Sequence, residues 1–88
     1  MTYNLRANNK TYIVSDHAAQ RMLERFISDE LVIKTLENGH ITEQPHGRDL
    51  YEHQIYDQIL EIMVIVQVVV EEDVRIIVSV IDDTSEGK

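Results

Sequence analysis

The sequence predicts an α+β domain in which two helices pack on one face of an antiparallel sheet. Two long runs of Val and Ile, at about 60–70 and 74–81, flank the acidic break Glu71-Glu72-Asp73. Two stretches with helix start and stop signals, at about 17–25 and 29–38, precede these runs. The expected order is therefore a short N-terminal strand, two helices and a four-stranded antiparallel meander.

The Val- and Ile-rich runs are expected to form a β-hairpin, because β-branched residues suit a pleated, buried surface and lose side-chain freedom in a helix. A register with Val70 opposite Val74 gives one unbroken aliphatic face, which is the expected core face. The other face mixes polar residues with apolar ones, namely Met63, Ile65, Val69, Ile77 and Ile81. The acidic break argues against a single membrane-spanning helix, which needs about 20 consecutive apolar residues.

Both helices have local boundary signals. Ser15 or Asp16 is the expected N-cap of the first helix, and Ser28 is the expected N-cap of the second. Their side-chain oxygens can accept a hydrogen bond from a free amide of the first turn. Gly39 follows the second helix as a C-terminal stop. The connection between the helices is short, so we expect them to form a compact pair.

The remaining segments are shorter and more polar. Residues 11–14 are expected to form the first strand, and residues 40–44 and 50–56 form the strands before the hairpin, with a turn at 45–48. Residues 1–10 contain the turn signal Asn8-Asn9 and are expected to be a polar N-terminal segment. A single domain would then occupy residues 11–83, followed by a polar tail at 84–88.

The charge is unevenly distributed along the chain. The net charge is −8, and all of it falls in residues 49–88, which contain ten acidic residues and only two basic ones, Arg75 and Lys88. A field of this sign repels phosphate backbones, although it leaves room for a small local basic patch. Because the chain has no Cys and its N-terminus has no apolar signal-peptide run, we expect a cytoplasmic protein.

His17, Arg21 and Arg25 recur every four residues and therefore share one face of the first helix. RNA cleavage needs a group that exchanges protons near neutral pH and cations for the developing phosphorane charge, so these residue types fit a catalytic face. The alternative is structural. His17 would then contribute to the helix start, Arg21 would pair with Glu24 or with a carboxylate of the sheet, and the Arg stems would cover the helix junction.

The other candidate sites are weaker. His40, His46 and His53 match no compact metal motif, and the acidic break lacks the spaced ligands of a calcium loop. We therefore expect exposed histidines, a solvated hairpin tip, and no metal or cofactor. Tyr51 and Tyr56 could stack on bases, but no Lys or Arg surrounds them, which favours a packing or interface role.

The segment from Ser15 to Arg25 resembles the motif H-A-x-x-R-M-x-x-R of a bacterial family of domains of unknown function, which is similar to the RelE-like and BrnT-like toxins of type II toxin–antitoxin systems. The resemblance covers about residues 11–82. It implies the small toxin fold, mRNA cleavage and an antitoxin partner, with His17, Arg21 and Arg25 as the matching motif residues. This chain has Phe26 where the family usually has Gly, and Phe at positive φ is strained.

Two functions follow as alternatives. The first is a toxin-like ribonuclease in which His17 is the acid or base and Arg21 and Arg25 bind phosphate. The second is a non-catalytic protein that forms a homodimer or binds an antitoxin-like partner through the apolar residues of the outer hairpin face, because exposed apolar patches usually mark an interface. The helix motif favours the first function, and the net charge favours the second.

Overall fold

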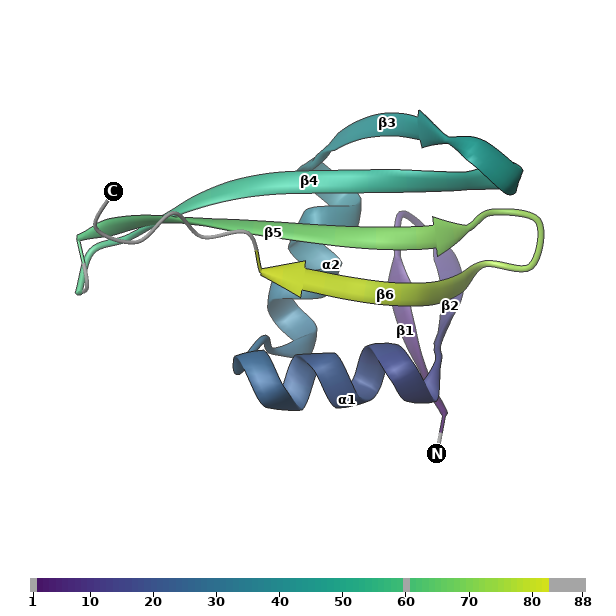
Figure 1. The fold of residues 1–88 in the computed structure, drawn as a ribbon, viewed down its shortest axis with the longest axis horizontal. Coiled ribbons are helices and arrows are strands. Elements are labelled where there is room, and N and C mark those ends of the chain that lie inside the picture. Colours follow the sequence, from purple (N-terminus) through teal and green to yellow (C-terminus); the bar gives the residue numbers. More distant parts are fainter. Residues whose placement is uncertain (1, 60, 83–88) are drawn as a thin grey trace.

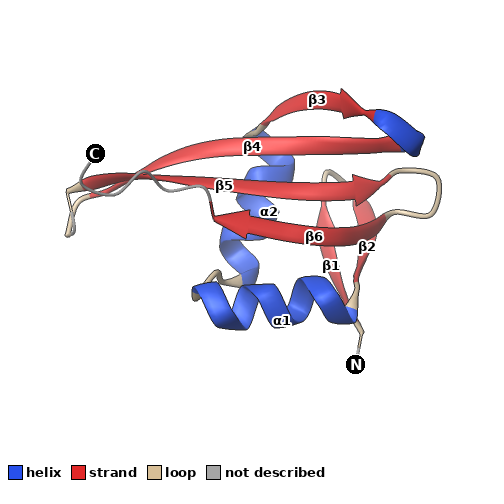
Figure 2. Ribbon diagram, viewed as in Figure 1, coloured by secondary structure: helices blue, strands red, loops and turns tan. Residues whose placement is uncertain are grey.

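The computed structural model describes residues 2–59 and 61–82. Within this range, six strands form one mixed sheet in the order β1-β2-β6-β5-β4-β3, and two helices pack on it (Figures 1 and 2). The elements in chain order are β1 (Tyr3–Ala7), β2 (Lys10–Val14), α1 (Asp16–Arg25), α2 (Asp29–Asn38), β3 (His40–Gln44), the short 3-10 turn η1 (Pro45–Gly47), β4 (Arg48–Asp57), β5 (Ile62–Glu71) and β6 (Ile76–Asp82). Leu60, expected to begin a strand, and residues 83–88 lie outside the described residues.

The predicted α+β class and the four-stranded meander are confirmed. Strands β3, β4, β5 and β6 follow one another in the sheet, and each pairs antiparallel with the next. Helix α2 contacts β4 and β5 on one side of this meander, whereas α1 contacts β6. Figure 1 shows α2 crossing behind the strands and α1 running alongside β6.

The expectation of a single N-terminal strand is wrong, because residues 3–7 form β1 as well. This strand pairs with β2 through a hairpin whose two turn residues, Asn8 and Asn9, have φ angles of 55° and 62°. Both positive angles are what a type I′ turn requires. The segment that appeared polar buries Leu5 and Ala7. In addition, β2 pairs with β6 in parallel, so the sheet is mixed rather than antiparallel throughout.

The predicted register of the β5–β6 hairpin is also wrong. Val70 lies opposite Ile77 instead of Val74, because residues 72–75 form the connection and the pairing shifts between Val69 and Val70. Val69 pairs with Ser79, so one residue of β6 is left over as a β-bulge. The bulge turns Ile77 to the helix side, where its side chain is fully buried. Its expected place on the outer face is therefore incorrect.

The core lies between β5, β6 and the two helices. Alternate residues of β5 (Val66, Val68 and Val70) are fully buried, as the aliphatic pattern predicted. Helix α2 contributes Val32 and Leu36 to the same cluster, and α1 contributes Ala18 and Met22. The roof over the aliphatic side of β5 is therefore made by residues of the helix pair.

Serine caps begin both helices. The Ser15 hydroxyl accepts a hydrogen bond from the Ala18 amide at 3.1 Å, and the Ser28 hydroxyl accepts one from the Leu31 amide at 3.2 Å. These bonds satisfy amides that the helices leave free, as both N-cap predictions required. None of the helices within the described residues is long and apolar enough to cross a bilayer.

Candidate functional site

A groove between α1 and β6 gathers the three predicted motif residues. Its walls are His17, Arg21 and Arg25 from α1 and residues 79–82 from β6, and its volume is about 310 Å³. The three side chains follow the helical period of four residues, so they project from α1 in one row. The helix face inferred from the sequence is thus one wall of a real depression, and the strand supplies the other.

The groove exists because α1, rather than a strand, lies beside the part of β6 that β2 does not reach. Strand β2 pairs with β6 only through Ile13 and Val14. The chain then turns, and the Ser15 amide donates to the Ile77 carbonyl at 3.2 Å while the Ser15 hydroxyl donates to the Val78 carbonyl at 3.3 Å. Helix α1 starts at this anchor and continues along β6 (Figure 1). Its row of long side chains therefore faces the end of the strand.

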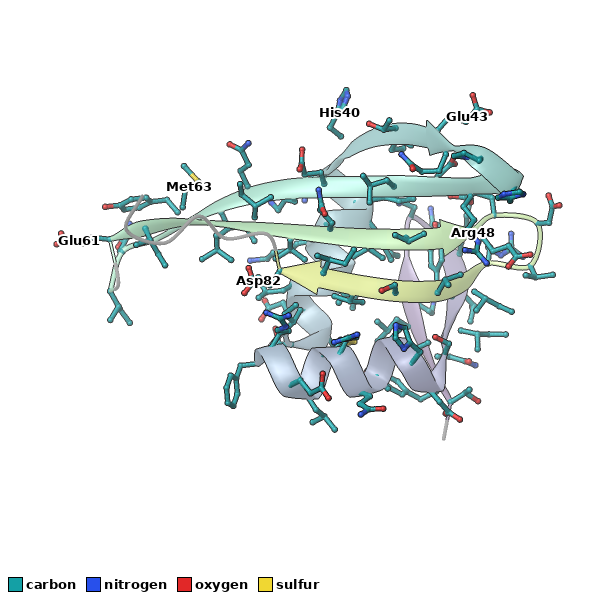
Figure 3. The ribbon with its side chains drawn as sticks, in the orientation of Figure 1. His40, Glu43, Arg48, Glu61, Met63 and Asp82 are labelled. Carbon is teal, nitrogen blue, oxygen red and sulfur yellow. The ribbon has the colours of Figure 1, made fainter. Side chains whose placement is uncertain are left out.

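The charges in the groove are mainly positive. Arg21 Nη1 lies 3.4 Å from Glu24 Oε1, and both side chains are about half exposed, so this pair contributes little to stability and leaves the guanidinium accessible. Among the described residues, no hydrogen bond or ion pair holds the side chain of His17 or Arg25. Asp82, at the end of β6 (Figure 3), adds one carboxylate.

This arrangement suits a phosphate-containing ligand. A guanidinium presents a planar fork of donors that matches phosphate oxygens, and two of them lie one helical turn apart here. An imidazole on the same wall can take or give a proton beside the bound phosphate. The row is exposed to solvent, so a ligand can reach all three side chains.

A comparison with protein families matches residues 14–82 to a domain of unknown function, DUF4258. The chain belongs to the DUF4258 family. This finding confirms the resemblance to a family of domains of unknown function, and the matched segment includes every residue that lines the groove. It omits β1 and all of β2 except Val14. No match to the chain was found among curated proteins or among solved structures.

The other three histidines of the DUF4258 domain do not line the groove and do not converge on one another. His40 pairs with Glu52, and His53 pairs with the buried Val66, so the two imidazoles belong to opposite faces of the sheet. Figure 3 shows His40 projecting away from β3. His46 lies in η1 with a φ of 67°. Within residues 2–59 and 61–82, no group of three or more His, Asp or Glu side chains is placed to hold a metal ion.

The outer face of the sheet keeps four of the five apolar residues assigned to it. Met63 and Ile81 are 44% and 41% exposed, and Ile65 and Val69 are half-buried. Leu50 joins them because it lies directly opposite Val69. Sequence reasoning missed Leu50 because nothing local fixed the register of its strand.

A second feature that the sequence did not reveal is a tyrosine–carboxylate contact. The Tyr51 hydroxyl donates a 2.6 Å hydrogen bond to Glu72 Oε2. Burial, this bond and the nearby negative charge raise the pKa of Tyr51 above its usual range. Tyr51 was expected in a packing or interface role, and its side chain is buried. Glu72 was expected in a solvated hairpin tip, but the structure joins it to Tyr51, which fixes the β5–β6 connection to β4.

Proposed function

We propose that this DUF4258 domain is a metal-independent ribonuclease of the RelE/BrnT toxin type and that it cleaves RNA in the groove between α1 and β6. The observation that supports this proposal is the convergence of His17, Arg21 and Arg25 on one groove wall. Each of the three has the chemistry that phosphodiester cleavage needs, and they line one groove of about 310 Å³.

The residues take the following roles. Arg21 and Arg25 bind the scissile phosphate and stabilise the charge that accumulates on its oxygens. His17 removes the proton from the adjacent 2′-hydroxyl, whose oxygen forms a bond to phosphorus while the bond from phosphorus to the 5′-oxygen breaks. The 5′-oxygen then takes up a proton from water while protonated His17 returns its own proton to solvent, so the products are a 2′,3′-cyclic phosphate and a free 5′-hydroxyl.

The net charge of −8 is compatible with this assignment because, among the described acidic residues, Asp82 alone lines the groove. The acidic connection of Glu71, Glu72 and Asp73 lies at the opposite end of β6 from Asp82 (Figure 1). Charges separated by more than about 8–10 Å are largely screened at physiological salt. The two guanidiniums outnumber the Asp82 carboxylate among the residues that line the groove, so the local charge favours a phosphate, and the distant carboxylates reduce non-specific binding to nucleic acid.

Induced expression in bacteria tests the proposal. The wild-type chain should arrest growth and shorten mRNA, and His17→Ala and Arg25→Ala should each abolish both effects. His40→Ala is the matched control, because His40 is also an exposed imidazole and lies far from the groove on β3. Growth that is indifferent to the wild-type chain, or arrest that persists with His17→Ala, would overturn the assignment. Circular dichroism of each purified variant checks that the fold is retained.

The second candidate function is a homodimer contact through the outer sheet face. The supporting observation is that Met63, Ile65, Val69, Ile81 and Leu50 form apolar neighbours on the side away from α2. At the centre of this face, Gln67 Nε2 donates to Glu52 Oε2 at 2.9 Å, so two of its polar groups satisfy each other. An apolar surface of this kind is typical of a protein interface.

Sedimentation measures this second function directly. The wild-type protein should sediment as a dimer, and Ile65→Asp should give a monomer because it puts a charge in the contact. Ile41→Asp is the control: Ile41 is 52% exposed, but it pairs with Tyr51 and so belongs to the opposite face. A monomeric wild type that also binds no antitoxin-like protein through this face would exclude the interface.

A further inference from the structure

Phe26 combines two unfavourable features at the end of α1. It is the C-cap of the helix with φ 56° and ψ 40°, which is the left-handed conformation, and its side chain is 93% exposed. A residue other than glycine is sterically strained in this conformation, because its Cβ lies too close to the following carbonyl oxygen. An exposed aromatic ring gains nothing from burial in return. Strained residues of this kind cluster at functional sites, so we expect the Phe26 side chain to have a function other than stabilising the fold.

The turn between the helices does not need the aromatic ring. Backbone bonds make the turn, because the Phe26 amide donates to the Leu23 carbonyl and the Ile27 amide donates to the Met22 carbonyl. Ile27, the next residue, supplies the buried anchor and is only 6% exposed. Glycine at position 26 would form the same cap at lower cost. The phenyl group is therefore dispensable for the structure.

The position of Phe26 relative to the groove suggests its role. Phe26 does not line the groove itself, but its neighbour in the chain, Arg25, does so at the last turn of α1, and the Cα atoms of consecutive residues are about 3.8 Å apart. In a nucleic acid, each phosphate is joined through a sugar to a base. A single strand whose phosphate is bound by Arg25 therefore carries a base within reach of the next side chain. Aromatic side chains stack on bases whose partners are absent.

We propose that Phe26 is a stacking platform for an unpaired base of single-stranded RNA bound in the groove. This inference rests on the proposed function, which it deepens by naming the form of the substrate. The phosphate contacts of Arg21 and Arg25 fix the strand, and the ring selects strands whose bases are free of a complementary strand. Duplex RNA, whose bases are already stacked and paired, is excluded from this contact.

Fluorescence tests the contact directly, because the chain has no tryptophan. Phe26→Trp introduces a single indole, and a short, uncleavable 2′-O-methyl oligonucleotide should quench its emission. The same strand with an abasic nucleotide at the stacked position should bind without quenching. Quenching that is identical with the fully abasic backbone would show that the indole senses phosphate rather than a base, and it would overturn the inference.

Affinity measurements separate this inference from the proposed function. Phe26→Ala should weaken binding of the single strand by about 5- to 150-fold, the equivalent of the ~1–3 kcal/mol of one stacked base. Phe26→Leu should lose as much, whereas Leu23→Ala, at an exposed position of the same helix, should bind as the wild type does. If Arg25→Ala abolishes binding and Phe26→Ala does not, the stacking platform is wrong and the ribonuclease proposal stands. If the wild type binds no RNA, the ribonuclease proposal and the stacking platform both fail. If Phe26→Ala changes the sedimentation coefficient of the protein and leaves RNA binding unchanged, the ring makes a contact between copies of the chain and the inference fails.

Discussion

The hydroxyl of Tyr51 donates a 2.6 Å hydrogen bond to the carboxylate of Glu72, joining the middle of β4 to the connection between β5 and β6. Tyr51 is 6% exposed, and the buried Tyr12 lies beside it. Hydrogen bonds to a charged group contribute about 1.5–3 kcal/mol. Tyr51→Phe should therefore lower the free energy of unfolding at pH 7 by about 1–3 kcal/mol. Urea denaturation measures the change, and an unaltered midpoint would contradict it.

The same contact predicts a loss of stability at alkaline pH. Burial and Glu72 raise the pKa of Tyr51 above its value of about 10 in the unfolded chain. Above pH 10 the unfolded chain therefore loses a proton that the folded chain keeps, and the free energy of unfolding falls as the pH rises. Tyr51→Phe should flatten this fall. Tyr3→Phe should flatten part of it too, because burial and Asp29 raise the pKa of Tyr3 to about 12. If the free energy of unfolding of the double variant falls as steeply with pH as that of the wild type, this account is refuted.

Phe26→Gly should stabilise the fold. It removes the steric cost of a left-handed Phe, about 1–2 kcal/mol, and gives back about 0.5–1 kcal/mol through the greater freedom of glycine in the unfolded chain. The expected gain in the free energy of unfolding is about 0.5–1 kcal/mol. Phe26→Ala is the matched control, since alanine keeps the Cβ that causes the strain and should give no such gain. Equal stability of the two variants would show that the backbone at this position is relaxed.

Gly39→Ala should destabilise the junction of α2 and β3 for a different reason. A Cβ at Gly39 would collide with the Thr35 carbonyl oxygen and lie 2.9 Å from the Glu52 carbonyl oxygen, and both are backbone atoms that cannot rotate away. The helix end and β4 must then separate, which costs about 1–3 kcal/mol, as overpacking does. Gly47→Ala is the comparison, because no atom lies within 4 Å of its added Cβ and only its φ of 73° opposes the change. Thermal denaturation of both variants should rank Gly39→Ala as the more damaging.

Ile77→Ala and Ile81→Ala test the corrected register of β6. Ile77 is fully buried, and its truncation should cost about 2–5 kcal/mol through lost burial and the cavity left behind. Ile81 is 41% exposed, so the same change there should cost less than about 1 kcal/mol in the monomer. The hairpin register inferred from the sequence put both residues on the outer face and predicts equal, small effects. Coincident denaturation curves of Ile77→Ala and Ile81→Ala would support the register inferred from the sequence and contradict the one in the structure.

These residues also show why the sequence predicted some elements and not others. The N-caps Ser15 and Ser28 act within a single turn, so their signal is local and the helix boundaries followed from it. The place of Ile77 depends on a bulge and on a connection of four residues, and neither has a local signature. β1 was missed because its segment is mostly polar. Its apolar residues Leu5 and Ala7 form part of the core face only once the strand pairs with β2. The helix wall of the groove was predictable from a period of four, but the β6 wall was not.

Ser15 holds α1 against β6 and should act as a positioning residue for the groove. Its hydroxyl accepts from the Ala18 amide and donates to the Val78 carbonyl. Ser15→Ala removes both bonds and should lower the free energy of unfolding by about 1–2 kcal/mol. Ser15→Asp keeps the acceptor for the amide but cannot donate to the carbonyl, so it should retain the cap and lose the anchor. Amide hydrogen exchange of α1 should then be faster in both variants than in the wild type, and cleavage of RNA should be slower in both. If Ser15→Asp exchanges and cleaves as the wild type does, the bond to Val78 does not position the groove.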